Sequence, residues 1–122
     1  MTTSKPFRRV DKAILNALIQ LVSEIPFEKI TVQHILEEAL ISRYTFYAHF
    51  RDKYEVAERL QEELYQEFLT FMRKKIPELY VQDRPPEDHH RLIDALAIQF
   101  AKAHYAKIQA IKKIRTDTVD YF

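Results

Sequence analysis

Hydrogen-bonding side chains are concentrated in one short stretch of this sequence, ISRYTFYAHFRDKYE, which runs from residue 41 to residue 55. Within about two helical turns it places Ser42, Arg43, Thr45, Tyr47 and His49. An arginine can donate two hydrogen bonds to one guanine, whereas hydroxyl and imidazole groups can donate to phosphate oxygens. A helix that only packs needs few such groups, so the pattern indicates a helix that lies against another polymer.

The composition narrows the classes of protein to consider. The 122 residues are 47% apolar, which allows a core, and they include no cysteine and no glycine. Disulfides, thiolate chemistry and glycine-rich phosphate loops are therefore excluded, and an all-α fold with short connections is expected. No apolar run approaches the roughly 20 residues that span a bilayer. Because a chain without cysteine suits a reducing cytosol, we predict a cytoplasmic protein without membrane contact.

The first half has the pattern of three helices. Apolar residues recur at helical spacing over residues 10–22, and Pro26 prevents that helix from continuing. Thr31 is the expected N-cap of a second, short helix, and Ser42 that of a third, which runs through about Phe50. Two short helices joined by about three residues are typical of a helix-turn-helix.

Two longer helices are expected after it. Asp52 and Glu55 form a variant capping box that begins a fourth helix, and Pro77 is predicted to end it. Residues 77–90, PELYVQDRPPEDHH, form the one clear linker. A fifth helix then begins near Glu87 and carries a long apolar face through Ile114. Too few partners remain within the chain to cover the first part of that face, so we expect it to be exposed.

The third helix divides its side chains between two faces. Phe46 and Phe50 lie four residues apart and are predicted to point into the core. Arg43 lies on a different face, where its guanidinium could read a base edge in the major groove. Tyr44 and Tyr47 share that face, with Thr45 and His49 beside it, and Lys53 at the start of the fourth helix could add a phosphate contact. Net charges of +2 for residues 1–54 and −4 for residues 55–88 weakly favour a nucleic-acid partner for the first half.

The run ITVQHILEEALISRYTFYAHFRDKYEVAERL resembles the DNA-binding domain of the TetR/AcrR family of bacterial transcriptional regulators. The matching features are I-T-V-x-x-I-L in the second helix and S-R-Y-T-F-Y-x-H-F-x-D-K in the third helix and its exit, preceded by PFEKIT. The resemblance covers roughly residues 7–60. It implies a three-helix DNA-binding domain at residues 1–53, followed at residues 54–122 by two long helices of a partial ligand-binding and dimerisation domain.

The family pattern also implies roles for individual residues, which all belong to one predicted DNA-binding set. It gives base contacts to Gln33, Arg43 and Tyr44, and phosphate contacts to Thr31, Thr45, Tyr47, His49 and Lys53, with Ser42 in the same set. Two positions depart from the family. Leu40 stands where glycine is usual in the turn, which predicts a different turn or a strained backbone, and Tyr44 stands where glycine often precedes the threonine.

The resemblance further implies double-stranded DNA as the partner and a homodimer that acts as a repressor on a near-palindromic operator. A small-molecule effector of unknown identity would release the DNA. Five residues could line its pocket, although core packing would explain them equally well: Phe68, Phe71, Met72, Phe100 and Tyr105.

Other functions are weighed against this one. A protein-interaction module, or a fragment of a longer regulator with weak DNA binding, is the alternative, and loss of DNA binding on Arg43→Ala would separate the two. His89 and His90 suggest a metal, but adjacent helical residues point about 100° apart and their neighbours on the helix do not complete a ligand set. We expect no metal, no cofactor and no enzymatic activity, because no catalytic constellation is visible.

Overall fold

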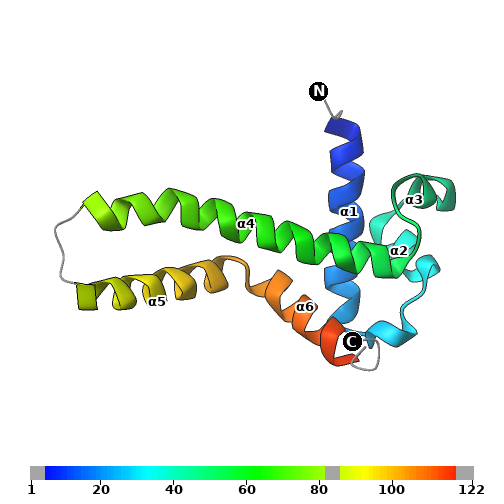
Figure 1. Ribbon diagram of the computed structural model, residues 1–122. Helices are drawn as coiled ribbons and strands as arrows, with labels where there is room; N and C mark the ends of the chain where they lie inside the picture. Colours follow the sequence, from blue (N-terminus) through cyan, green and yellow to red (C-terminus); the bar gives the residue numbers. More distant parts are fainter. Residues whose placement is uncertain (1–4, 82–85, 118–122) are drawn as a thin grey trace.

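Figure 1 shows a chain of helices in which a long hairpin extends from a cluster of shorter elements. The computed structural model describes residues 5–81 and 86–117, and these are helical without any strand. The elements are α1 (Lys5–Val22), the 3-10 turn η1 (Phe27–Lys29), α2 (Val32–Ala39), α3 (Arg43–His49), α4 (Lys53–Val81), α5 (Pro86–Ala103) and α6 (Tyr105–Asp117). The all-α prediction is confirmed, and so is the helix-turn-helix order of the first three helices.

Side-chain caps begin the short helices where the sequence predicts them. Thr31 Oγ1 accepts a hydrogen bond from the His34 amide at 3.1 Å, and His34 Nδ1 accepts one from the Thr31 amide at 3.0 Å. This is a reciprocal capping box with histidine in the place of the usual Glu or Gln. Ser42 Oγ accepts from the Thr45 amide at 3.0 Å and caps α3 in the same way.

The start of α4 uses a wider version of the same arrangement. Asp52 Oδ1 accepts a hydrogen bond from the Glu55 amide at 2.9 Å, as the predicted capping box requires. The Glu55 carboxylate, however, accepts from the amide of Arg51, one residue before the cap. Both carboxylates also lie near the positive end of the α4 dipole, which favours a helix start at Lys53.

Leu40 occupies the left-handed backbone region between α2 and α3. Its φ is 59° and its ψ is 49°, and its side chain is 89% exposed. The amides of Leu40 and Ile41 both donate to the Leu36 carbonyl, so the turn has the ordinary form that ends a helix on glycine. The turn therefore has the usual shape of a left-handed helix end but is strained, because a left-handed conformation costs an L-residue with a Cβ roughly 1–2 kcal/mol.

The hairpin formed by α4 and α5 corrects two predictions. Pro77 does not end α4, which continues to Val81, because a proline near a helix end removes one backbone hydrogen bond and leaves the carbonyl of exposed Arg73 open to water. The predicted linker at residues 77–90 is accordingly shorter: residues 77–81 belong to α4 and residues 86–90 to α5, and residues 82–85 lie outside the described part.

The predicted fifth helix is also divided in two at His104. The His104 ring stacks on Phe100 at 4.1 Å, and both its amide and its Nδ1 approach the Phe100 carbonyl, at 3.0 and 3.1 Å. This break allows α5 to run back along α4 while α6 turns beneath α1 (Figure 1). The apolar face expected to be exposed on α5 is exposed only in part: Ile93 is 45% exposed and Leu92 and Leu96 are half-buried, whereas Phe100 is 6% exposed because it packs against α4.

One apolar core joins the elements that surround α1. Ile14 and Leu18 of α1 and Val56 and Leu60 of α4 are fully buried. The same cluster includes residues of η1, α2 and α3, together with Ala110 and Ile114 of α6. The orientation of α3 is therefore set by packing against a core to which the C-terminal helix contributes.

Candidate nucleic-acid interface

The short helix α3 presents two chemically distinct faces, as its sequence predicts. Phe46 and Phe50 are 0% and 2% exposed, which confirms that they anchor α3 in the core. Arg43 and Tyr44 lie on the exposed side, where the Tyr44 side chain is 86% exposed. Tyr47 is half exposed, and the edge-to-face contact of its ring with Phe46, at 5.2 Å, limits the directions in which its hydroxyl can point.

Arg43 and Gln33, both predicted to contact bases, are brought together across the helix-turn-helix. Arg43 Nη2 donates to Gln33 Oε1 at 2.7 Å, and Gln33 Nε2 donates to Glu37 Oε2 at 3.1 Å. The three side chains form an exposed chain of hydrogen bonds that joins α3 to α2. It holds the guanidinium in one place while leaving further N–H groups of its planar fork for a ligand.

The hydroxyl groups of the predicted set differ in what they can offer a phosphate. Thr31 Oγ1 only accepts in its capping box, so its hydroxyl hydrogen can still donate outward. Ser42 Oγ instead donates to Thr45 Oγ1 at 2.9 Å while it accepts the Thr45 amide. Ser42 is therefore engaged in holding the first turn of α3, whereas Thr45 retains a hydroxyl hydrogen for a phosphate oxygen.

His49 does not face outward, which corrects its predicted phosphate contact. Its side chain is 7% exposed, and Nδ1 lies 2.5 Å from Asp11 Oδ1. Arg59 Nη1 donates to the other carboxylate oxygen of Asp11 at 2.9 Å, and its guanidinium lies over the Phe50 ring at 5.3 Å. Asp11 of α1 thus ties the end of α3 to α4, and the imidazole serves to position α3.

Lys53 is likewise turned inward, away from its predicted role on a phosphate. Its Nζ donates to the carbonyls of Phe27, Glu28 and Ile30 at 2.7, 3.2 and 2.8 Å. It also lies over the Phe27 ring at 4.7 Å. Burial lowers the pKa of Lys53, and the nearby charge of Glu28 only partly opposes this. Because three acceptors match the three N–H groups of an ammonium, Lys53 fixes the turn that leads into α2.

The sequence analysis did not predict the roles of Asp11 and Arg59, although the position of Asp11 on its helix could have indicated a buried carboxylate. It lies three and four residues before Ile14 and Leu15, so it occupies the buried face of α1. A carboxylate on such a face requires buried partners. Nothing in the sequence marks Arg59 as one of them, because 48 residues separate it from Asp11.

The five predicted pocket residues do not line one cavity. Phe100 is 6% exposed and is packed by Phe68 at 5.3 Å and by Phe71 at 5.5 Å. Phe68 and Phe100 line one groove, and Phe71 lines another. Tyr105 lines a separate groove beside α1, and Met72 is half buried on α4. In the part of the chain that the structure describes, no group of metal-ligating side chains could hold an ion.

The arrangement of α2 and α3 against α1 defines a helix-turn-helix DNA-binding unit. Residues 14–60 match the family model described as bacterial regulatory proteins, tetR family. Residues 14–60 thus form a helix-turn-helix domain of the type found in TetR-family transcriptional regulators. Neither the curated proteins nor the solved structures give a match to the chain. None of the described helices is both long enough and apolar enough to cross a membrane.

Proposed function

We propose that this chain is a sequence-specific transcriptional repressor that binds a near-palindromic DNA operator as a homodimer. The DNA-facing surface consists of six side chains: Thr31, Gln33, Arg43, Tyr44, Thr45 and Tyr47. Arg43, Gln33 and Tyr44 read bases in the major groove, while the three remaining hydroxyl groups contact phosphates. A small-molecule effector then favours a state of the dimer that releases the DNA.

The observation that carries the proposal is the bond between Arg43 and Gln33. A bidentate contact to guanine requires a guanidinium that is exposed and held in one orientation. The 2.7 Å hydrogen bond to Gln33 supports such an orientation, and the buried Phe46 and Phe50 keep α3 from rotating.

The homodimer is supported by the apolar side chains that the hairpin leaves uncovered. Ile93 and Ile98 on α5 and Tyr65 on α4 are between 45% and 56% exposed. Large apolar side chains that stay exposed on a helical hairpin are suited to an interface with another chain. In a symmetric dimer, the same surface of each copy would be covered by its partner, and two α3 helices would then reach successive major grooves.

Fluorescence anisotropy with labelled duplex DNA from upstream of its own gene tests the proposal, with scrambled duplex as the reference. We expect the upstream DNA to bind about 10³-fold more tightly than the scrambled duplex, with an affinity that falls steeply as salt rises. Arg43→Ala should weaken specific binding by about 1–3 kcal/mol, which is roughly 5- to 150-fold. Arg91→Ala, an exposed arginine on α5, is the matched control and should bind as the wild type does.

Equal and weak binding to both duplexes would contradict the proposal. So would an Arg43→Ala protein whose affinity for upstream DNA equals that of the Arg91→Ala control. In either case the chain would act through protein contacts of its hairpin.

A further inference from the structure

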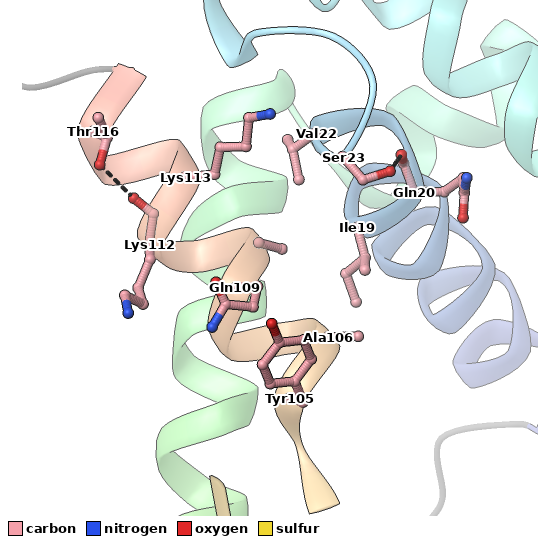
Figure 2. Close-up of a pocket in the computed structure, with 11 residues that line it drawn as sticks. Ile19, Gln20, Val22, Ser23, Tyr105, Ala106, Gln109, Lys112, Lys113 and Thr116 are labelled. Atoms are coloured by element: carbon pink, nitrogen blue, oxygen red, sulfur yellow. Dashed lines mark hydrogen bonds between the residues drawn. The ribbon is translucent and has the colours of Figure 1, made fainter. Parts of the chain in front are cut away.

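An open groove runs along the surface where the C-terminal half of α1 packs against α6 (Figure 2). Its volume is about 620 Å³, which lies within the range of sites that hold drug-sized molecules. Ile19 and Val22 of α1 form one apolar side, and Ala106 and Ala110 of α6 form the other. Val22 and Ala110 are buried beneath the groove, whereas Ala106 is exposed and small, so α6 leaves room for a guest beside Ile19.

The two ends of this groove differ in chemistry. The Tyr105 ring, 64% exposed, lies at one end of the groove (Figure 2). At the other end, the Lys113 side chain extends from α6 towards Val22 at the end of α1, whereas Lys112 points away from α1 (Figure 2). None of the described lining residues is acidic, so no carboxylate within the groove neutralises Lys113.

We propose that the groove binds an amphipathic organic anion, namely a flat aromatic carboxylate. The aromatic body would lie on Ile19 and Ala106 and stack against the exposed Tyr105 ring. The carboxylate would face Lys113, whose charge complements it. A neutral ligand would leave the lysine without a partner, and an acidic groove would repel the anion, so the charge of the lining residues selects this class.

A ligand in the groove would bridge two parts of the chain. The wall formed by α1 belongs to the helix-turn-helix unit, and the wall formed by α6 belongs to the helices that follow it. A bound anion therefore stabilises one spacing of α6 relative to α1. Any effect on DNA release rests on the proposed function, whereas binding of the anion itself does not.

Titration with two probes of nearly the same shape tests the proposal. The probes are 1-naphthoate and the uncharged 1-naphthalenemethanol, and calorimetry on the full chain gives their affinities. We expect naphthoate to bind about fivefold more tightly, which is what one exposed charge pair can contribute. Lys113→Met should remove this preference while keeping the apolar stem, and Lys102→Met on α5, also exposed, should keep it.

A second pair of variants tests the position of the site. Ala106→Phe should fill the groove and abolish binding of both probes, whereas Ala95→Phe on the exposed side of α5 should leave it unchanged. Both alanines are exposed, so circular dichroism should show that both variants fold as the wild type does.

Three results would overturn the proposal: no binding of naphthoate, equal affinity of the wild type for the two probes, or undiminished binding by Ala106→Phe. The DNA titration tests the proposed function and is independent of the naphthoate titration. Naphthoate binding without any preference for upstream DNA would contradict the proposed function and leave the groove as a ligand site.

Discussion

Replacing Leu40 by glycine should stabilise this protein, because Leu40 adopts a backbone conformation that glycine reaches without steric cost. The left-handed region costs a residue with a Cβ about 1–2 kcal/mol. Glycine also increases the conformational entropy of the unfolded chain, which reduces the gain in stability by about 0.5–1 kcal/mol. The Leu40 side chain is 89% exposed, so little apolar burial is lost. The net expectation is a gain of about 0.5–1 kcal/mol in the free energy of unfolding.

Urea denaturation followed by circular dichroism at 222 nm measures this gain. For a chain of this length, a gain of that size also raises Tm by about 2–4 °C. All proteins must be compared at one concentration, because self-association would make Tm depend on it. Leu40→Ala is the matched control: it removes the exposed side chain but keeps the Cβ, so it should stay within about 0.5 kcal/mol of the wild type.

The comparison of the two variants can refute the reasoning. If alanine stabilises the protein as much as glycine does, the exposed leucine side chain is the source of the cost and the backbone is not. If glycine destabilises the protein, the turn between α2 and α3 is not strained in solution.

Two further predictions concern charged side chains. Asp11→Asn should lower the free energy of unfolding by about 1–3 kcal/mol in urea denaturation, because it weakens the bonds to His49 and Arg59. The control Asp94→Asn changes an exposed carboxylate and should alter the free energy of unfolding little. Equal effects of the two substitutions would show that the bonds of Asp11 to His49 and Arg59 do not stabilise the fold. Burial opposes the charge of Lys107, but its hydrogen bonds to Glu63 and Glu67 outweigh this and raise its pKa above 10.5. At neutral pH the wild type should therefore be more stable than Lys107→Met by about 1 kcal/mol, and this difference should disappear as the pH rises through that pKa. A difference in stability that persists above that pKa would contradict the prediction.

Local features of the fold could be predicted from the sequence. Thr31, Ser42 and Asp52 cap helices through bonds that reach three residues along the chain, so their spacing alone reveals them. The burial of Phe46 and Phe50 follows from their helical period in the same way.

Features that depend on distant partners could not be predicted. His49 and Lys53 are predicted to contact phosphates, but His49 binds Asp11 and Lys53 binds the carbonyls of Phe27, Glu28 and Ile30. These partners lie 23 to 38 residues away in the sequence. The break at His104 was not predicted either, because the apolar periodicity continues through it, although α6 beyond the break packs against α1. These features are determined by tertiary packing, and the apolar periodicity of a helix does not indicate them.

The sharing of one core by α1 and α6 also limits how this chain can evolve. Ala110 and Ile114 are buried in the same cluster as Phe46 and Phe50, which anchor α3 60 or more positions before them. A substitution that enlarges or shrinks either residue would disturb the packing that orients α3, even if selection had acted only on α6. The C-terminal helix and the helix-turn-helix therefore have to change in step, and α6 could not be exchanged freely with the equivalent helix of another regulator.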